Sequence, residues 1–225
     1  MAGGEGRRLR PLTTHTPKPL LLVGDKPIIE HNVFRLQQFG IENIYVTLNY
    51  LGNQLRNYFQ QRENGCLRFS FIEETQPLGT IGSVRLIPEF SNNHLLIMNS
   101  DLLTNIDYED FYTEFCKKNA DMAVATIPYK VDIPYAVLET DEHFVRDFKE
   151  KPTYTYYSNA GIYILKREVI DLIPVNSFFN ATDLMETLIK TGRNVLSYPL
   201  LNYWLDIGKH DDYKKAQEDI KHIKF

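Results

Sequence analysis

The sequence predicts an α/β fold of three layers, with a mixed, mainly parallel sheet and a small β-rich insert. Two observations lead to this expectation. Short apolar runs alternate with amphipathic stretches of helical period up to about residue 130. Beyond that point, short strands follow one another and only two further helices are indicated. We expect the β-rich part to cover the carboxyl ends of the parallel strands, where ligands bind in such sheets.

The elements of the first part of the chain follow from their hydrophobic periods. Four apolar runs are predicted to be buried strands: residues 43–48, 67–72, 94–98 and 121–127. Four amphipathic stretches before and between them are predicted to be helices: residues 27–39, 51–61, 79–87 and 107–118. In the first helix, Ile29, Val33 and Leu36 share one face, and Gly40 follows the end. The alternation of strands and helices favours parallel strand pairing.

The later elements are shorter. Residues 135–140 and 144–148 are predicted to form a hairpin, and residues 159–165 a further strand. Asn180 is suited to cap a helix over residues 181–190, with Gly192 just past its end. Residues 194–198 and 203–206 are expected to be short strands, and residues 210–222 a polar helix.

Composition places the chain among ordinary globular proteins. Its 225 residues are 43% hydrophobic and 24% charged, which predicts a single domain, residues 1–225, with a real core. The net charge of −4 argues against a nucleic-acid partner. No apolar run is long enough to cross a bilayer and no leader pattern is present, so we expect no membrane partner and a cytoplasmic location. Cys66 and Cys116 fit a reducing compartment, and we expect both to be buried.

A glycine-rich segment lies near the start of the chain. Gly3, Gly4 and Gly6 allow backbone N–H groups to close around phosphate oxygens, and Arg8 and Lys18 can neutralise their charge. The dinucleotide fingerprint does not fit, since leucine stands where its third glycine belongs, and no Walker-type run exists. The glycines alone favour a flexible surface loop with ordinary basic residues.

Two acidic motifs suit a metal ion. Asp101 follows the predicted strand 94–98, and Asp206 follows a short apolar run in the motif Trp-Leu-Asp-Ile-Gly. Two carboxylates together with phosphate oxygens form a natural Mg²⁺ site. Either residue alone could equally cap a turn or a helix.

Two further segments are rich in residues that suit small ligands. In residues 73–83, Pro77 ends a strand, Gly79 permits close backbone approach, and free N–H donors are expected near Thr80. The run Lys-Glu-Lys-Pro at residues 149–152 precedes the motif Ser-Asn-Ala-Gly at residues 158–161. Taken alone, residues 73–83 are also typical of a turn with packed glycines, and residues 149–152 of a solvated turn.

The combined motifs resemble one family. Gly4-Glu5-Gly6-Arg7-Arg8-Leu9-Arg10-Pro11-Leu12-Thr13, followed by Pro17-Lys18-Pro19 and Lys26-Pro27-Ile28, is similar to the signature of sugar-phosphate nucleotidylyltransferases, the NDP-sugar pyrophosphorylases. The other motifs follow in the family's order. The nearest resemblance is to mannose-1-phosphate and heptose-1-phosphate guanylyltransferases and to nucleotidyltransferase domains that follow CBS pairs. It implies the Rossmann-like nucleotide-diphospho-sugar transferase fold, with the insert binding sugar.

The resemblance also implies an activity and a set of site residues. The enzyme would transfer a nucleotidyl group from a nucleoside triphosphate, with GTP favoured, to a sugar 1-phosphate and release pyrophosphate. Catalytic residues would be Arg8 and Lys18. Nucleotide-binding residues would be Gly3, Gly4, Gly6, Pro77, Gly79 and Thr80. Sugar-phosphate ligands would be Glu150, Lys151, Asn159 and Gly161. The Mg²⁺ ligands would be Asp101 and Asp206.

Some points stay open at this stage. The alternatives are a regulatory subunit that binds nucleotide sugars without turnover, and a cytidylyltransferase for an alcohol phosphate. Ala136 stands where many family members carry glycine, so the sugar is undetermined, as are the base and the oligomeric state. Family members have an aliphatic strand directly before the glycine loop. We therefore expect a catalytic domain that lacks its first strand or was cut from a longer chain, for example one with a CBS-type module ahead of it.

Overall fold

A four-stranded mixed sheet forms the centre of the computed structural model, which describes residues 1–61 and 65–223. The strand order is β11 (Val195–Pro199), β7 (Met122–Asp132), β10 (Thr153–Lys166) and β5 (His94–Met98). β11 runs parallel to β7, whereas β10 runs antiparallel to both of its neighbours. β3 (Asn43–Leu48) and β4 (Arg68–Glu73) form a separate parallel pair. The expected mixed α/β architecture is therefore confirmed.

Helices cover the strands where the sequence pattern predicts them. Ile29, Val33 and Leu36 of α1 (Ile28–Gln38) are buried, as their spacing requires. α2 (Gly52–Gln60) packs on β3 and β4. Asp107 caps α3 (Tyr108–Lys117) by accepting a hydrogen bond from the Asp110 amide at 3.0 Å. α4 (Ala181–Lys190) carries a capping box at its start, and α5 (His210–Asp219) is the last helix of the described residues. No helix among the described residues is long and apolar enough to cross a membrane.

The predicted helix over residues 79–87 is wrong. The chain there forms only a 3-10 turn, Gly82–Leu86. Gly79 has a φ of +77°, and the amides of Ile81 and Gly82 both donate to the Phe179 carbonyl at 3.1 Å. Contacts with a distant segment therefore satisfy the donors that a continuous helix would have used.

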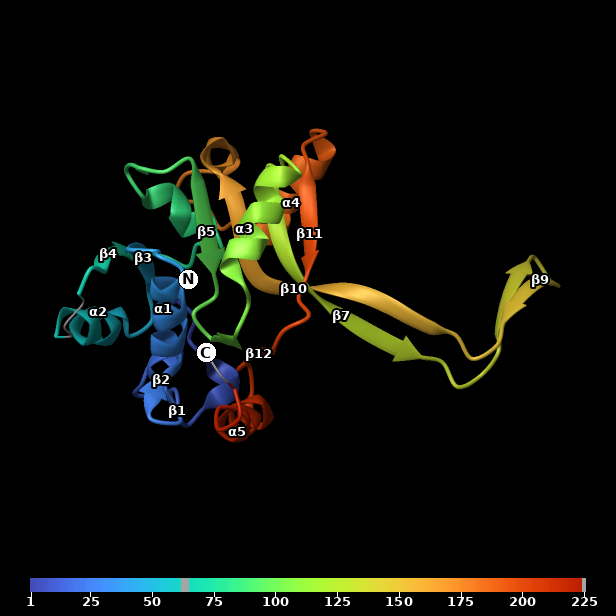
Figure 1. Cartoon of the computed structure of the whole chain (residues 1–225), viewed down its shortest axis with the longest axis horizontal. Helices are drawn as coiled ribbons and strands as arrows, with labels where there is room; N and C mark the ends of the chain where they lie inside the picture. The colour runs from blue at the N-terminus through green and yellow to red at the C-terminus, as the bar shows by residue number, and fades with distance from the viewer. Residues whose placement is uncertain (62–64, 224–225) are drawn as a thin grey trace.

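The β-rich part is a projecting arm. β7 and β10 extend well beyond the predicted strands 121–127 and 159–165 and pair as far as Asp132 and Thr153. The arm ends in the hairpin β8 (Val137–Asp141) and β9 (Phe144–Lys149), which confirms the predicted hairpin (Figure 1). Every residue of β9 is exposed. The expectation that this part covers the strand ends is wrong in this conformation, because the paired ribbon carries the hairpin away from the sheet.

Smaller elements complete the fold. β1 (Leu22–Val23) and β2 (Lys26–Pro27) form a short antiparallel pair. β6 (Leu102–Thr104) pairs antiparallel with β12 (Trp204–Asp206). Both cysteines are exposed, so the expectation that they are buried is wrong.

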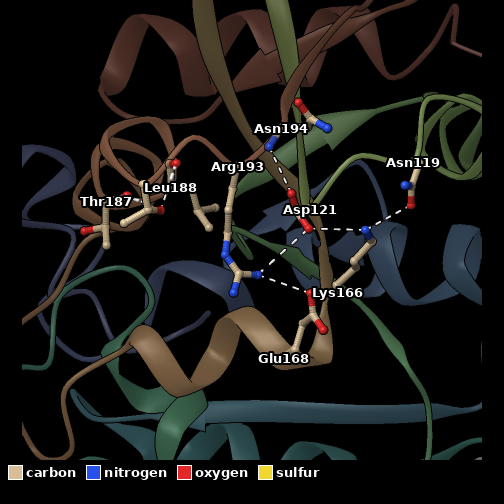
Figure 2. Close-up of polar contacts among 9 residues, drawn as sticks. Asn119, Asp121, Lys166, Glu168, Thr187, Leu188, Arg193 and Asn194 are labelled. Carbon is tan, nitrogen blue, oxygen red and sulfur yellow. Dashed lines mark hydrogen bonds and ion pairs between the residues drawn. The ribbon is translucent and has the colours of Figure 1, made fainter.

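A polar network joins the starts of β7 and β11 to the end of β10, on the side of the sheet away from the arm. Asp121 accepts hydrogen bonds from the Asn194 amide at 2.9 Å and from Lys166 Nζ at 3.2 Å (Figure 2). Arg193 lies 3.9 Å from Asp121 and 3.1 Å from Glu168. Burial alone would raise the pKa of Asp121, but these donors and cations together hold the pKa below its usual value. The network therefore stabilises the junction of β7, β10 and β11.

Candidate active site

Two carboxylates far apart in the sequence meet on one short ladder. Asp101 directly precedes β6, and Asp206 ends β12. The register pairs Asp206 with Leu102, and the Ile207 amide donates to the Asp101 carbonyl at 3.1 Å. Backbone hydrogen bonds therefore position both acidic side chains in the same place.

A buried lysine lies between the two carboxylates. Lys18, in a short 3-10 turn (Lys18–Leu20), is only 8% exposed. Its Nζ donates a short hydrogen bond to Asp101 Oδ2 and lies 3.7 Å from Asp206 Oδ1. The other carboxylate oxygen, Asp101 Oδ1, is buried and has no hydrogen-bond partner among the described residues. One cation thus serves two anions, and one buried acceptor is left available to a ligand.

The electrostatics of Asp206 reflect this excess of negative charge. Its pKa is raised, first by burial and then by the charge of Asp101, while Lys18 and Arg8 oppose the rise. The Arg8 guanidinium is close by, because a Cβ on Gly208 would lie 3.1 Å from Arg8 Nη2 and 3.3 Å from Asp206 Oδ2. The geometry therefore brings together the four charged side chains that the sequence singled out near the glycine loop and the acidic motifs.

The glycine loop is held at both ends and open in the middle. Gly6 has a φ of +60°, and a Cβ there would lie 2.9 Å from Thr13 Cγ2. Thr13 Oγ1 donates to the Gly6 carbonyl at 2.8 Å. A Cβ on Gly3 would lie 3.0 Å from Asn49 Cβ, whereas one on Gly4 would meet nothing within 4 Å. The loop is thus packed against the protein at residues 3 and 6 and accessible at residue 4.

A cavity of about 260 Å³ lies between the loop and Asp101. It is lined by Ala2, Gly4, Gly6, Arg7, Arg8, Lys18, Pro19, Ser100, Asp101 and Gly208. The lining combines loop backbone, two arginines and a lysine with an aspartate, a set that suits an anion bound together with a cation.

Hydrogen bonds join the segment around Gly79 to the start of α4. The Thr80 amide donates to Asn180 Oδ1 at 3.2 Å, so the expectation of a free donor there is wrong. A Cβ on Gly79 would lie 2.6 Å from the Phe179 carbonyl oxygen. Close packing against Phe179 therefore requires a glycine at this position. Pro77 is exposed on the surface of this turn.

Sequence reasoning did not single out Glu74, which links this turn to the glycine loop. Its Oε2 accepts a hydrogen bond from the Leu78 amide at 3.3 Å, and its Oε1 would lie 3.5 Å from a Cβ on Gly3. The sequence feature that could have identified Glu74 is its position directly after the strand β4. The Glu74 side chain therefore lies between the two predicted nucleotide-binding segments.

The predicted sugar-phosphate residues fall into two groups. Gly161 has a φ of +73°, and a Cβ there would lie 2.6 Å from Asn99 Nδ2. The Gly161 amide donates to Asn159 Oδ1 at 2.8 Å, so both residues lie beside the strand end that precedes Asp101. Glu150 and Lys151 are exposed in the turn between β9 and β10. Figure 1 shows β9 far from β12, the strand that ends at Asp206.

Known proteins share the sequence profile and the fold of this chain. The sequence profile of the nucleotidyl transferase family matches residues 1–223. Mannose-1-phosphate guanyltransferase of Saccharomyces cerevisiae is 31% identical over 227 residues, covering 95% of this chain and 61% of the relative. The chain thus spans about three-fifths of the length of such relatives. D-glycero-alpha-D-manno-heptose 1-phosphate guanylyltransferase of Aneurinibacillus thermoaerophilus is 27% identical and is covered over 97% of its length.

Solved structures share the fold. HddC from Yersinia pseudotuberculosis, complexed with GMP-PN, superposes with a TM-score of 0.74 at 25% identity, covering 97% of this chain and 96% of that one. A putative glucose-1-phosphate thymidylyltransferase from Bacillus anthracis gives a TM-score of 0.79 at 24% identity, covering 100% of this chain and 94% of that one. The family profile, which spans almost the whole chain, and this shared fold lead to one conclusion: the chain belongs to the nucleotidyl transferase family.

Proposed function

We propose that the protein transfers a nucleotidyl group from a nucleoside triphosphate, preferably GTP, to a sugar 1-phosphate and releases pyrophosphate. One observation carries the proposal: Arg8, Lys18, Asp101 and Asp206 converge beside a cavity lined by the glycine loop. Family membership and the guanyltransferase relatives support the reaction class and the preference for guanine. We also propose a cytoplasmic location, which the two free, exposed cysteines support.

Asp101 and Asp206 fit a divalent cation. Asp101 Oδ1 is buried without a partner among the described residues, and the pKa of Asp206 is raised by burial and by Asp101. Because of both features, a bound cation would stabilise the two carboxylates. We propose that these carboxylates hold Mg²⁺ together with phosphate oxygens of the substrates. The bound ion would supply electrostatic stabilisation of the phosphates.

The protein's own groups suit in-line transfer. A sugar-phosphate oxygen attacks the α-phosphorus, a new P–O bond forms, and the bond to pyrophosphate breaks with its electrons on the leaving oxygen. Arg8 and Lys18 reduce the cost of the negative charge on the phosphates, and the accessible backbone at Gly4 binds the triphosphate. The exposed face of Pro77, with Gly79 and Thr80, contacts the base.

The sugar phosphate is bound by two groups of residues in this proposal. Asn159 and Gly161 already lie next to Asn99, near the carboxylates. Glu150 and Lys151 lie on the projecting arm, so their role as sugar-phosphate ligands requires the arm to bend toward Asp101. The two-stranded ribbon of β7 and β10 outside the sheet is the part that would bend.

A pyrophosphate-release assay tests the proposal. Each of four nucleoside triphosphates is combined with mannose 1-phosphate, glucose 1-phosphate and a heptose 1-phosphate in the presence of Mg²⁺. We expect turnover with GTP and at least one sugar phosphate, and turnover about 100-fold lower or less in Asp206→Asn. Binding without turnover of any pair would favour a regulatory subunit. Turnover of an alcohol phosphate with CTP alone would favour a cytidylyltransferase, and either result would overturn the proposal.

A further inference from the structure

A short turn, residues 207–209, leads from Asp206 into α5 and packs against the glycine loop. Ile207 is fully buried in the same hydrophobic cluster as Leu9 of the loop. Leu9 directly follows Arg8, and Ile207 directly follows Asp206. A shared core therefore fixes the backbone beside the two charged side chains that the proposed function assigns to phosphate and to Mg²⁺.

Gly208, in the middle of this turn, lies against both of those side chains. It is buried, and a Cβ there would lie 3.1 Å from Arg8 Nη2, 3.5 Å from Arg8 Cζ and 3.3 Å from Asp206 Oδ2. The φ of Gly208 lies outside the left-handed region, unlike those of Gly6 and Gly161. The backbone alone therefore does not require glycine here. The requirement comes from the space that the guanidinium and the carboxylate occupy.

The first turn of α5 holds Gly208 in place. Asp212 Oδ2 accepts hydrogen bonds from the Gly208 amide at 3.2 Å and from the Lys209 amide at 3.0 Å. Ala216, one helical turn further on, is fully buried in the same cluster as Ile207. Figure 1 shows α5, in red, beside the dark blue start of the chain. The helix therefore anchors the turn to the glycine loop.

His210 joins α5 to the backbone on the other side of Arg8. Its Nε2 lies 2.9 Å from the Arg10 carbonyl oxygen, and because a carbonyl oxygen only accepts, this ring nitrogen carries the hydrogen. The Arg10 amide donates to the Arg7 carbonyl at 3.3 Å and closes a 3-10 turn. Arg8 lies inside that turn, so the hydrogen bond from His210 restrains the backbone that carries the guanidinium.

We propose that Gly208 and His210 are positioning residues for Arg8. Together they hold its guanidinium beside Asp206: Gly208 leaves the space that the guanidinium occupies, and His210 restrains the turn from which the side chain extends. The separation of the two charged groups decides whether one phosphate can contact Arg8 and a cation on Asp206 together, and an error of about 1 Å is costly. Because pyrophosphate is taken as the ligand of Arg8, this inference rests on the proposed function.

A double-mutant cycle tests Gly208. The dissociation constant of inorganic pyrophosphate with Mg²⁺ is measured by calorimetry in the parent, in Gly208→Ala, in Arg8→Ala and in the double variant. We expect Gly208→Ala to weaken binding about tenfold or more, because the added methyl group displaces the guanidinium. Its Tm should change by at most about 2 °C, because the atoms that must move are the ends of side chains. In the Arg8→Ala background the same substitution should weaken binding at most about twofold.

Two substitutions test His210. Glutamine can still donate a hydrogen bond to the Arg10 carbonyl, whereas alanine cannot. We expect His210→Ala to weaken pyrophosphate binding about threefold or more, and His210→Gln to recover most of that loss. Neither should change Tm by more than about 2 °C, because the side chain is exposed. His222→Ala, an exposed histidine beyond the end of α5, is the matched control and should bind pyrophosphate as the parent does.

Three results would overturn the proposal. Gly208→Ala could weaken binding equally with and without Arg8, which would mean that the methyl group acts through Asp206 or the fold. His210→Ala could bind pyrophosphate as tightly as the parent. A parent chain that turns over its substrates but binds no pyrophosphate would overturn this proposal alone. Binding with the expected cycle, but without turnover of any substrate pair, would support the positioning of Arg8 and overturn only the proposed function.

Discussion

Replacing Lys18 by methionine tests how the candidate site balances its charges. Lys18 is the cation nearest to both carboxylates, and its side chain is only 10% exposed, against 25% for Asp101. Methionine keeps most of the side-chain volume but leaves Asp101 and Asp206 facing each other. Breaking a buried ion pair on one side costs about 3–5 kcal/mol, and the partial exposure of Asp101 places this case at about 3 kcal/mol.

The expected consequences are measurable by thermal unfolding. For a chain of this length, about 3 kcal/mol corresponds to a fall in Tm of roughly 6–12 °C. In the double variant Lys18→Met with Asp101→Asn, the uncompensated charge is gone, so most of this loss should be recovered. Pyrophosphate release should be lost in both variants.

The double variant decides whether the reasoning holds. If its Tm equals or falls below that of Lys18→Met, the destabilisation comes from packing rather than from uncompensated charge. Lys18 would then not be the residue that balances the charge of the carboxylate pair. Lys26→Met provides the control for an exposed lysine outside the site and should leave Tm within about 1 °C.

Three further predictions follow from the same structure. Asp206→Asn should cut pyrophosphate release by about 100-fold or more without lowering Tm at pH 7, because its raised pKa means that the ionised form is disfavoured in the folded state. Asp121→Asn should lower Tm by several degrees at pH 7, and the difference from the parent should shrink as the pH falls below about 4, because the lowered pKa of Asp121 stabilises the fold only while it is ionised. Lys151→Ala should raise KM for the sugar phosphate at least about tenfold with no change in Tm, since the side chain is exposed.

Each of these three predictions can be contradicted by a specific measurement. A lower Tm at pH 7 in Asp206→Asn would mean that the carboxylate stabilises the fold. A Tm difference for Asp121→Asn that stays constant from pH 7 to pH 3 would exclude the charge of Asp121 as its cause. An unchanged KM in Lys151→Ala would remove the arm from sugar-phosphate binding, and Lys130→Ala, on the same ribbon, is the matched control.

The local elements could be predicted because their causes are local. The apolar face of α1 and the Asn180 cap of α4 can be recognised from residues spaced three or four positions apart. The 79–87 segment shows the limit of that reasoning, because the Phe179 carbonyl, a hundred positions away, binds its amides and prevents a helix. The outer halves of β7 and β10 were not predicted, although Tyr129 and Val131 alternate with Lys130 and Asp132, because most residues of these halves are exposed and no contact with the core supports so short a pattern.

The sequence by itself determined which residue types can serve the chemistry and in what order they come along the chain. It indicated the glycines of the loop, the two cations and the two aspartates, because each belongs to a motif readable over a few residues. Only the tertiary structure decided which of them meet. The pairing of β6 with β12 places Asp206 beside Asp101 and Lys18, while the long ribbon of β7 and β10 separates Lys151 from them. Strand pairing over long sequence separations depends on the whole fold, and no local pattern encodes it.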